Sequence, residues 1–177
     1  MFGRSAPLVL EIGSGMGETT AAIAQAHPET DFIAVEVHGP GVGSLLNRIE
    51  SLQLRNLKVI RHDAVDVLDK MIADASLAAI HLFFPDPWPK KRHHKRRLVQ
   101  PDFAALAARK LAPGGTLHAA TDWADYAEHM NEVFSRESLL EKATAGLMSR
   151  PATKFEVRGK RLGNPISDLY WRRSSGP

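Results

Sequence analysis

Short apolar runs alternate with amphipathic stretches from the start of the chain to about residue 135. Apolar runs are typical of buried strands, and apolar residues spaced three or four positions apart are typical of helices. Strands are therefore expected at residues 8–12, 32–37, 58–61, 79–84 and 116–120. Helices are expected at residues 19–26, 44–52, 65–71, 103–111 and 126–134, with a Pro-Gly-Gly stop at 113–115.

The order of these elements predicts the fold. Strands joined by helical crossovers form a mostly parallel sheet with helices on both faces, the doubly wound, Rossmann-like α/β arrangement. Such sheets bind ligands at the carboxyl ends of their strands. The length of 177 residues predicts a single domain, residues 1–177, because a second core would need more chain.

Composition limits the location and the chemistry. The chain contains no cysteine, which excludes disulfides, thiolate zinc sites and cysteine nucleophiles. No apolar run approaches the roughly 18 residues that would suggest a membrane span, and residues 1–5 do not resemble the start of a signal peptide. We therefore expect a cytoplasmic protein with no membrane partner.

Positive charge is concentrated in one short segment. Residues 90–97 hold six Lys and Arg and no acid, whereas residues 1–89 hold 6 basic against 11 acidic residues. A cluster of this kind favours a polyanion such as RNA over a solvated loop or a nuclear-targeting patch. His93 and His94 within it are chain neighbours without further ligands at helical spacing, so we expect no metal.

A glycine-rich segment follows the first predicted strand and opens the first predicted helix. In it, Gly13, Gly15 and Gly17 let the backbone turn sharply next to the unpaired N–H groups of a helix start. Glu36 ends the second strand, where a carboxylate can accept hydrogen bonds from ribose hydroxyls. The pair predicts a nucleoside site, although a tight turn without a ligand remains the alternative.

The nature of the nucleoside follows from Glu18. A dinucleotide fingerprint requires a third glycine at this position, and a negative charge opposes a pyrophosphate. The acid is tolerable beside S-adenosyl methionine, which has no phosphates and carries a sulfonium cation. Asp63, followed by Ala64, ends the third strand and either contacts the adenine amino group or caps the next helix.

A proline-rich loop, residues 83–89, ends the fourth strand and leads into the basic segment. Asp86 in this loop can accept hydrogen bonds from guanine N1–H and the exocyclic amine together. Guanine N7 has a free lone pair, so methylation there requires alignment more than a general base. A carboxylate also stabilises the cation that develops as N7 gains its methyl group. Asp86 is the predicted catalytic residue.

These motifs carry a family resemblance. Residues 83–88, followed by the basic segment 90–97 and preceded by Glu11-Ile12-Gly13, closely resemble the bacterial tRNA (guanine-N7)-methyltransferases. Two later segments, 120–123 and 153–159, agree with the same family, so the resemblance spans nearly the whole chain. It implies a class I methyltransferase that uses S-adenosyl methionine and modifies tRNA.

The resemblance also implies residue roles. The implied cofactor pocket is lined by the acids Glu11, Glu36, Asp63 and Asp86, the last of them catalytic, beside Gly13, Gly15, Gly17 and Ala64. The implied substrate contacts come from Lys90, Asp122, Thr153, Lys154, Phe155 and Glu156. The implied tRNA contacts come from Arg92, His93, His94, Lys95, Arg96 and Arg97. Taken alone, Trp123 and Phe155 are expected to be core aromatics.

Three other functions share some of these features. A nicotinamide-dependent oxidoreductase would share the fold and Glu36, but Glu18 opposes it. A non-catalytic RNA-binding protein would keep the basic segment and lose the pocket acids, which are all present. A methyltransferase acting on an exocyclic amine is the second choice, because Asp-Pro-Trp loosely resembles the Asn/Asp-Pro-Pro-aromatic loop.

Two features are left open by the sequence. Family members usually carry several tens of residues before the glycine-rich segment, whereas the first strand here begins almost at Met1. The resemblance implies that such a segment adds cofactor or tRNA contacts. The modified guanine and the oligomeric state are not indicated by any motif.

Overall fold

The computed structural model describes residues 1–153, 156, 163 and 165–175. Its strands are β1 (Leu8–Ile12), β2 (Asp31–Val35), β3 (Leu57–Ile60), β4 (Leu77–Phe83), β5 (Leu111–Thr121), β6 (Leu140–Lys142) and β7 (Ser167–Arg173). Its helices are α1 (Glu18–Ala26), α2 (Gly39–Ser51), α3 (Ala64–Met71), η1 (Lys91–Arg96, a 3-10 helix), α4 (Pro101–Lys110) and α5 (Ala124–Ser135). Every predicted strand and helix is present, with shifted ends.

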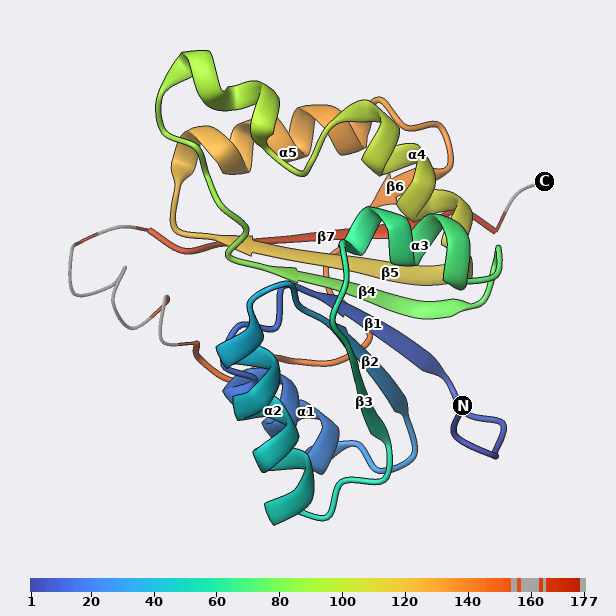
Figure 1. Ribbon diagram of the computed structural model, residues 1–177. Coiled ribbons are helices and arrows are strands. Elements are labelled where there is room, and N and C mark those ends of the chain that lie inside the picture. Colours follow the sequence, from blue (N-terminus) through green and yellow to red (C-terminus); the bar gives the residue numbers. More distant parts are fainter. Residues whose placement is uncertain (154–155, 157–162, 164, 176–177) are drawn as a thin grey trace.

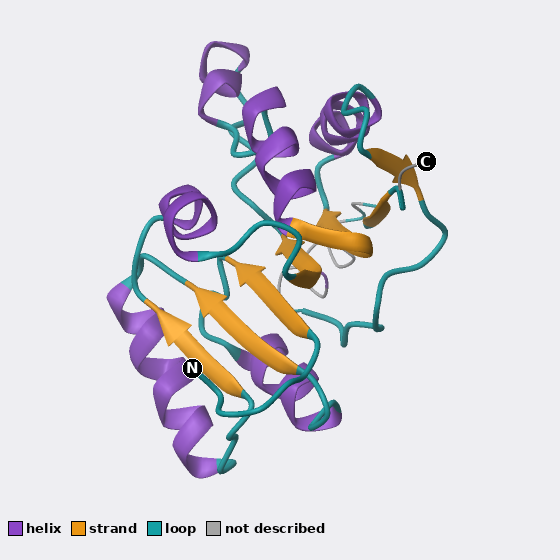
Figure 2. Ribbon diagram, turned by 90° about the vertical axis from the view of Figure 1, so that its right-hand side faces the viewer, coloured by secondary structure: helices purple, strands orange, loops and turns teal. Residues whose placement is uncertain are grey.

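The strands form one seven-stranded sheet in the order β3-β2-β1-β4-β5-β7-β6. The pairs from β3 to β5 are parallel, and β7 runs antiparallel to β5 and β6. Helices α1 and α2 cover one face, and α3, α4 and α5 cover the other (Figures 1 and 2). The predicted doubly wound, mostly parallel sheet is confirmed. The strand order reverses at β1, so the carboxyl ends of β1 and β4 face the crevice where such folds bind ligands.

The core lies on both faces of the sheet, because consecutive strand residues point in opposite directions. Leu10 and Ile33 pack in the cluster that includes residues of α3, α4 and α5, and Tyr126 of α5 is completely buried there. Val9 and Phe32 pack in the second cluster with residues of α1 and α2. Burial on both faces explains why these strands have continuous apolar sequences.

The last two strands were not predicted. Only alternate residues of β7 are apolar and buried, namely Leu169 and Trp171, and β6 has three residues. In β5 the predicted Pro-Gly-Gly stop is instead a register irregularity within a longer strand. A Cβ at Gly115 would lie 2.8 Å from the carbonyl oxygen of Leu77, so the neighbouring backbone leaves room only for glycine. Within the described residues, no helix has the length and apolar character required to span a bilayer.

Candidate active site

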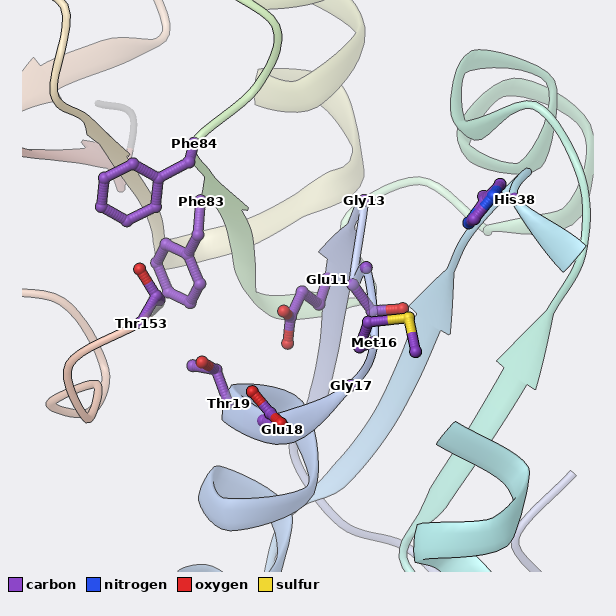
Figure 3. Close-up of a pocket in the computed structure, with 12 residues that line it drawn as sticks. Glu11, Gly13, Met16, Gly17, Glu18, Thr19, His38, Phe83, Phe84 and Thr153 are labelled. Carbon is purple, nitrogen blue, oxygen red and sulfur yellow. The ribbon is translucent and has the colours of Figure 1, made fainter. Parts of the chain in front are cut away.

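A pocket of about 430 Å³ opens at the carboxyl ends of β1 and β4, beside the start of α1. A volume of this size is typical of sites for small molecules and cofactors. Its lining residues are Glu11, Gly13, Ser14, Gly15, Met16, Gly17, Glu18, Thr19, His38, Phe83, Phe84 and Thr153. Figure 3 shows the Glu11 side chain pointing into the space between Phe83 and Thr19. The predicted glycine-rich segment therefore forms one wall of a real pocket.

The glycine-rich segment adopts a backbone that other residues rarely tolerate. Gly13, Gly15 and Gly17 have φ values of 74°, 56° and 76°, in the left-handed region that favours glycine. A Cβ on Gly17 would also lie 2.6 Å from Cδ1 of Leu45 in α2. The N-cap residue of the helix that follows is Gly17, which has no side chain to accept the N–H groups of the first turn.

Glu36 ties this segment to the end of β2. One carboxylate oxygen accepts the N–H of Gly15 at 2.7 Å, and the other accepts the N–H groups of Val37 and His38, both at 2.8 Å. A carboxylate has about four acceptor sites, so these bonds leave about one for a ribose hydroxyl. Glu36 is 8% exposed and lies behind the lining residues Gly15 and His38. Its first role is to fix the shape of the pocket.

Gly41 in α2 is a residue that the sequence analysis missed. A Cβ at this position would lie 2.4 Å from the carbonyl oxygen of Gly15 and 3.3 Å from Cγ of Glu36. The helix therefore packs directly against the glycine-rich segment and its anchoring acid. Gly41 lies before the helix predicted at residues 44–52, so its place inside α2 appears only in the structure. There a glycine costs helix stability unless close packing requires it.

Glu11 is the acid nearest the centre of the site. Its side chain lines the pocket and is 4% exposed, and burial raises the pKa of this carboxyl group to about 7. A cation entering the pocket would favour the ionised form of Glu11. The site therefore fits a ligand with a positively charged group.

Replacing Glu11 with glutamine is expected to flatten the pH dependence of stability between pH 4.5 and 7. The folded protein retains a proton on Glu11 in this window that the unfolded chain loses, so wild-type stability falls as pH rises. The raised pKa of about 7 corresponds to a loss of about 3 kcal/mol across the window. Thermal unfolding of both proteins at closely spaced pH values measures the difference. Parallel curves for the two proteins would contradict a raised Glu11 pKa.

Below the pocket, three titratable side chains stand in register across neighbouring strands. Glu11 of β1 pairs with His81 of β4, and His81 pairs with His118 of β5. His81 and His118 are each 1% exposed, and burial lowers the pKa of His81 to about 3. The row lies on the face that α1 and α2 cover, and it was invisible in sequence because the three residues are far apart along the chain.

Glu18 has a partner that the sequence did not indicate. Its carboxylate lies 2.9 Å from Nη2 of Arg48 in α2. This pair offsets part of the charge that the sequence analysis used against a pyrophosphate. The exclusion of a dinucleotide therefore depends more on the missing third glycine at position 18 than on charge.

Asp63 adopts the capping role that was its alternative. It is the N-cap of α3, and its Oδ1 accepts the N–H groups of Val65 and Asp66 at 2.8 and 3.1 Å. Ala64 begins the helix. Neither Asp63 nor Ala64 lines the pocket, so their predicted contacts with the adenine ring remain predictions.

The proline-rich loop leaves β4 along the pocket and then turns away. Phe84 has a φ of 52° and Trp88 a φ of 45°, values that are uncommon for large side chains and mark a constrained loop. Phe83 and Phe84 line the pocket, whereas Asp86 is exposed two residues further along. This position leaves the Asp86 carboxylate open to a substrate that approaches the pocket mouth.

The basic segment forms η1, directly after this loop. Five of its six cations are exposed, namely Lys90, Lys91, Arg92, Lys95 and Arg96. His93 and His94 are half-buried. The guanidinium carbon of Arg96 lies 4.9 Å from the centroid of the Trp88 ring. Among the described residues, no group of three or more His, Asp or Glu is arranged to hold a metal ion.

Arg97 corrects the prediction for this segment. Its side chain is 1% exposed and forms an ion pair with Asp125 of α5. It also donates to the carbonyl of Pro87 at 2.9 Å and stacks 4.7 Å from the ring centroid of Tyr126. Because its guanidinium is used inside the protein, Arg97 anchors the loop to α5 and is not available for the predicted RNA contact.

Comparisons with known proteins show the family to which the chain belongs. A family model described as "Putative methyltransferase" matches residues 5–169. A tRNA (guanine-N(7)-)-methyltransferase from Nitrosomonas europaea is 56% identical over 99% of this chain and 80% of its own length. Its counterpart from Bordetella pertussis is 58% identical over 98% of this chain and 70% of its own length. The chain belongs to the tRNA (guanine-N7-)-methyltransferase family.

Solved methyltransferase structures share the fold of this chain. An rRNA methylase from Streptococcus thermophilus superposes with a TM-score of 0.64 at 15% identity, covering 96% of this chain and 87% of that chain. A 16S rRNA (adenine(1408)-N(1))-methyltransferase from Catenulisporales acidiphilia gives a TM-score of 0.65 at 15% identity, with the same coverage of both chains. At this level of identity the likeness is one of fold.

Three further residues implied by the tRNA (guanine-N7-)-methyltransferase resemblance, Asp122, Thr153 and Glu156, belong to the described residues. Thr153 lines the pocket and is 7% exposed, and its Oγ1 accepts the N–H of Glu156 at 3.0 Å. Asp122 follows β5 and is half-buried. Trp123 is 37% exposed, so the expectation of a core aromatic is wrong for it. Lys154 and Phe155 lie outside the described residues.

Proposed function

We propose that this chain transfers the methyl group of S-adenosyl methionine to N7 of a guanine in tRNA. The observation that carries the proposal is a nucleoside-sized pocket, floored by Glu11, at the same sheet edge as the exposed basic segment. Relatives that are 56% and 58% identical bear the name of this activity. The expected cytoplasmic location would follow from a tRNA substrate.

The residues at the site fit this cofactor and this reaction. S-adenosyl methionine would supply an electrophilic methyl group, and its positive charge matches the buried Glu11 carboxyl group. Asp86 would accept hydrogen bonds from the guanine N1–H and exocyclic amine, which orients N7 toward the pocket. The same carboxylate would stabilise the positive charge that the guanine gains. No general base is required.

The test is incubation of the protein with unmodified tRNA and methyl-labelled S-adenosyl methionine, followed by nucleoside analysis. Labelled 7-methylguanosine is the expected product. Label in the exocyclic amine of a nucleoside would favour the second choice of target and overturn the N7 assignment. No labelled nucleoside, while a related tRNA methyltransferase methylates the same tRNA in a parallel reaction, would overturn the proposal.

Electrostatic binding of tRNA should now involve five cations, because Arg97 is buried. The logarithm of affinity is expected to fall with the logarithm of salt concentration with a slope of roughly four. Arg92→Met should reduce this slope by about 0.7 to 0.9 and leave the melting temperature unchanged, because Arg92 is exposed. Arg97→Met should lower the free energy of unfolding by about 2 kcal/mol, because it removes hydrogen bonds from a charged donor. Filter binding and thermal unfolding of both variants measure the contrast. A flat salt response would exclude the basic segment as the tRNA contact.

A further inference from the structure

Arg150 joins three separate parts of the chain at the side of the pocket. Its Nε and Nη2 donate to the two carboxylate oxygens of Asp168 in β7, at 2.9 and 3.0 Å. Its Nη1 donates to Glu156. The guanidinium carbon lies 5.6 and 5.4 Å from the ring centroids of Phe83 and Phe84. With only 6% of its side chain exposed, Arg150 is enclosed by these partners.

Asp168 is itself held from below by His118. The Nε2 atom of His118 lies 2.7 Å from Oδ1 of Asp168. Burial raises the pKa of Asp168, but hydrogen bonds from His118 and Arg150 outweigh it and hold that pKa at about 2. An ionised carboxylate only accepts hydrogen bonds, so His118 carries its proton on Nε2. Its Nδ1 is buried without a hydrogen-bond partner among the described residues, which fits this tautomer.

Residues 143–153 contain no helix or strand. The first half of this segment is held by the N–H of Ala143, which donates to the carbonyl of Tyr170, by the N–H of Leu147, which donates to Oγ1 of Thr116, and by the burial of Met148. After Met148, the path of the segment depends on the side-chain contacts of Arg150 and Thr153. The same segment brings Thr153 into the pocket wall, and Thr153 Oγ1 accepts the N–H of Glu156. Without Arg150, the carboxylates of Asp168 and Glu156 would lose the cation between them. Like charges in a partly buried space repel, which would move Glu156 and Thr153 away from the pocket.

We propose that Arg150, held by Asp168 and His118, is a positioning residue that sets Thr153 and Glu156 against the pocket for methyl transfer. This inference rests on the proposed function. Arg150 acts through its partners and has no assigned contact with cofactor or guanine. Arginine is required because its planar guanidinium forms a bidentate pair with Asp168 and a third hydrogen bond with Glu156, and its face packs against the rings of Phe83 and Phe84. Lysine would satisfy these partners only in part.

The test compares Arg150→Met, Arg150→Lys, Asp168→Asn and the double variant Arg150→Met with Asp168→Asn. Arg150→Met is expected to lower kcat for tRNA methylation at least tenfold while KM for tRNA changes less than threefold, because the basic segment still binds phosphates. Arg150→Lys should recover part of kcat. The double variant should be no slower than Arg150→Met, because both changes break one linkage.

Arg172→Met is the matched control. Arg172 lies in β7, the strand of Asp168, and like Arg150 it pairs with a carboxylate, that of Glu141, at 2.6 Å. This pair is exposed, and neither residue lines the pocket. The control should keep wild-type kcat. Hydrogen–deuterium exchange supplies a readout that needs no substrate: amides of residues 147–153 should exchange faster in Arg150→Met and not in Arg172→Met.

The outcomes separate the two proposals. Faster exchange at residues 147–153 with no methylation by the wild-type protein would overturn the proposed function and leave the role of Arg150 in holding the segment. Unchanged exchange together with a kcat within twofold of wild type would overturn the positioning role. Single-variant losses that multiply in the double variant would also overturn it, because independent effects do not form a linkage.

Discussion

Asp86→Ala is expected to lower the rate of methyl transfer to tRNA by about a hundredfold, while affinity for tRNA stays within threefold of wild type. Removal of one preorganised group that stabilises developing charge costs about 10² to 10³ in kcat. Asp86 is exposed and lies after the pocket residues Phe83 and Phe84, so its loss should leave the fold intact. Single-turnover methylation with saturating cofactor measures the chemical step.

Two further variants sharpen this prediction. Asp86→Asn keeps the size of the side chain and one acceptor oxygen, but it loses the negative charge and turns an N–H donor toward a guanine donor, so the fall in rate should be large but no greater than that of Asp86→Ala. Asp102→Ala removes another exposed acid, in the first turn of α4, and should keep wild-type turnover. If Asp86→Ala methylated tRNA at a near-normal rate, Asp86 would have no catalytic role.

Glu36→Ala should weaken the binding of S-adenosyl homocysteine by at least about tenfold. The substitution removes the acceptor of three backbone N–H groups, those of Gly15, Val37 and His38. Hydrogen bonds to a charged group contribute about 1.5 to 3 kcal/mol each. These bonds fix the shape of the glycine-rich segment, so the loss of even one should lower the affinity for S-adenosyl homocysteine by more than tenfold. Isothermal titration calorimetry measures the affinity directly.

The control for this prediction is Glu50→Ala, because Glu50 is an exposed acid on α2. It should bind S-adenosyl homocysteine as tightly as wild type. The affinity of Glu36→Gln is expected to lie between those of wild type and Glu36→Ala. The amide keeps one acceptor oxygen, but its NH2 group faces a backbone N–H that also donates. Affinity within threefold of wild type for Glu36→Ala would show that the glycine-rich segment keeps its shape without the carboxylate.

Most of the sheet could be predicted from the sequence because its strands are buried on both faces. Continuous apolar runs such as residues 32–35 of β2 stand out against the amphipathic helices. β7 was missed because only one of its faces is apolar, with Leu169 and Trp171 buried. Strand pairing over long sequence separations does not appear in any local window, and β7 pairs with β5 across about fifty residues.

The glycine-rich segment was also predictable, because a strand followed by closely spaced glycines has a local cause in the turn itself. The fate of the charged residues was not. Arg97 and Arg92 belong to one basic segment in sequence, yet Arg97 is buried against Asp125 and Tyr126, and Arg92 is exposed. Which member of a charge run turns inward depends on the elements that pack beside it.

By itself the sequence determined the mostly parallel α/β sheet, the glycine-rich turn after its first strand and the basic segment after its fourth. These features depend on local periodicity and composition, which a single chain displays directly. Only the tertiary structure decided that Glu36 locks the turn, that Gly41 must be small and that Arg150 meets Asp168. These contacts join residues from separate elements, and their energies depend on distance and burial that the folded backbone alone sets.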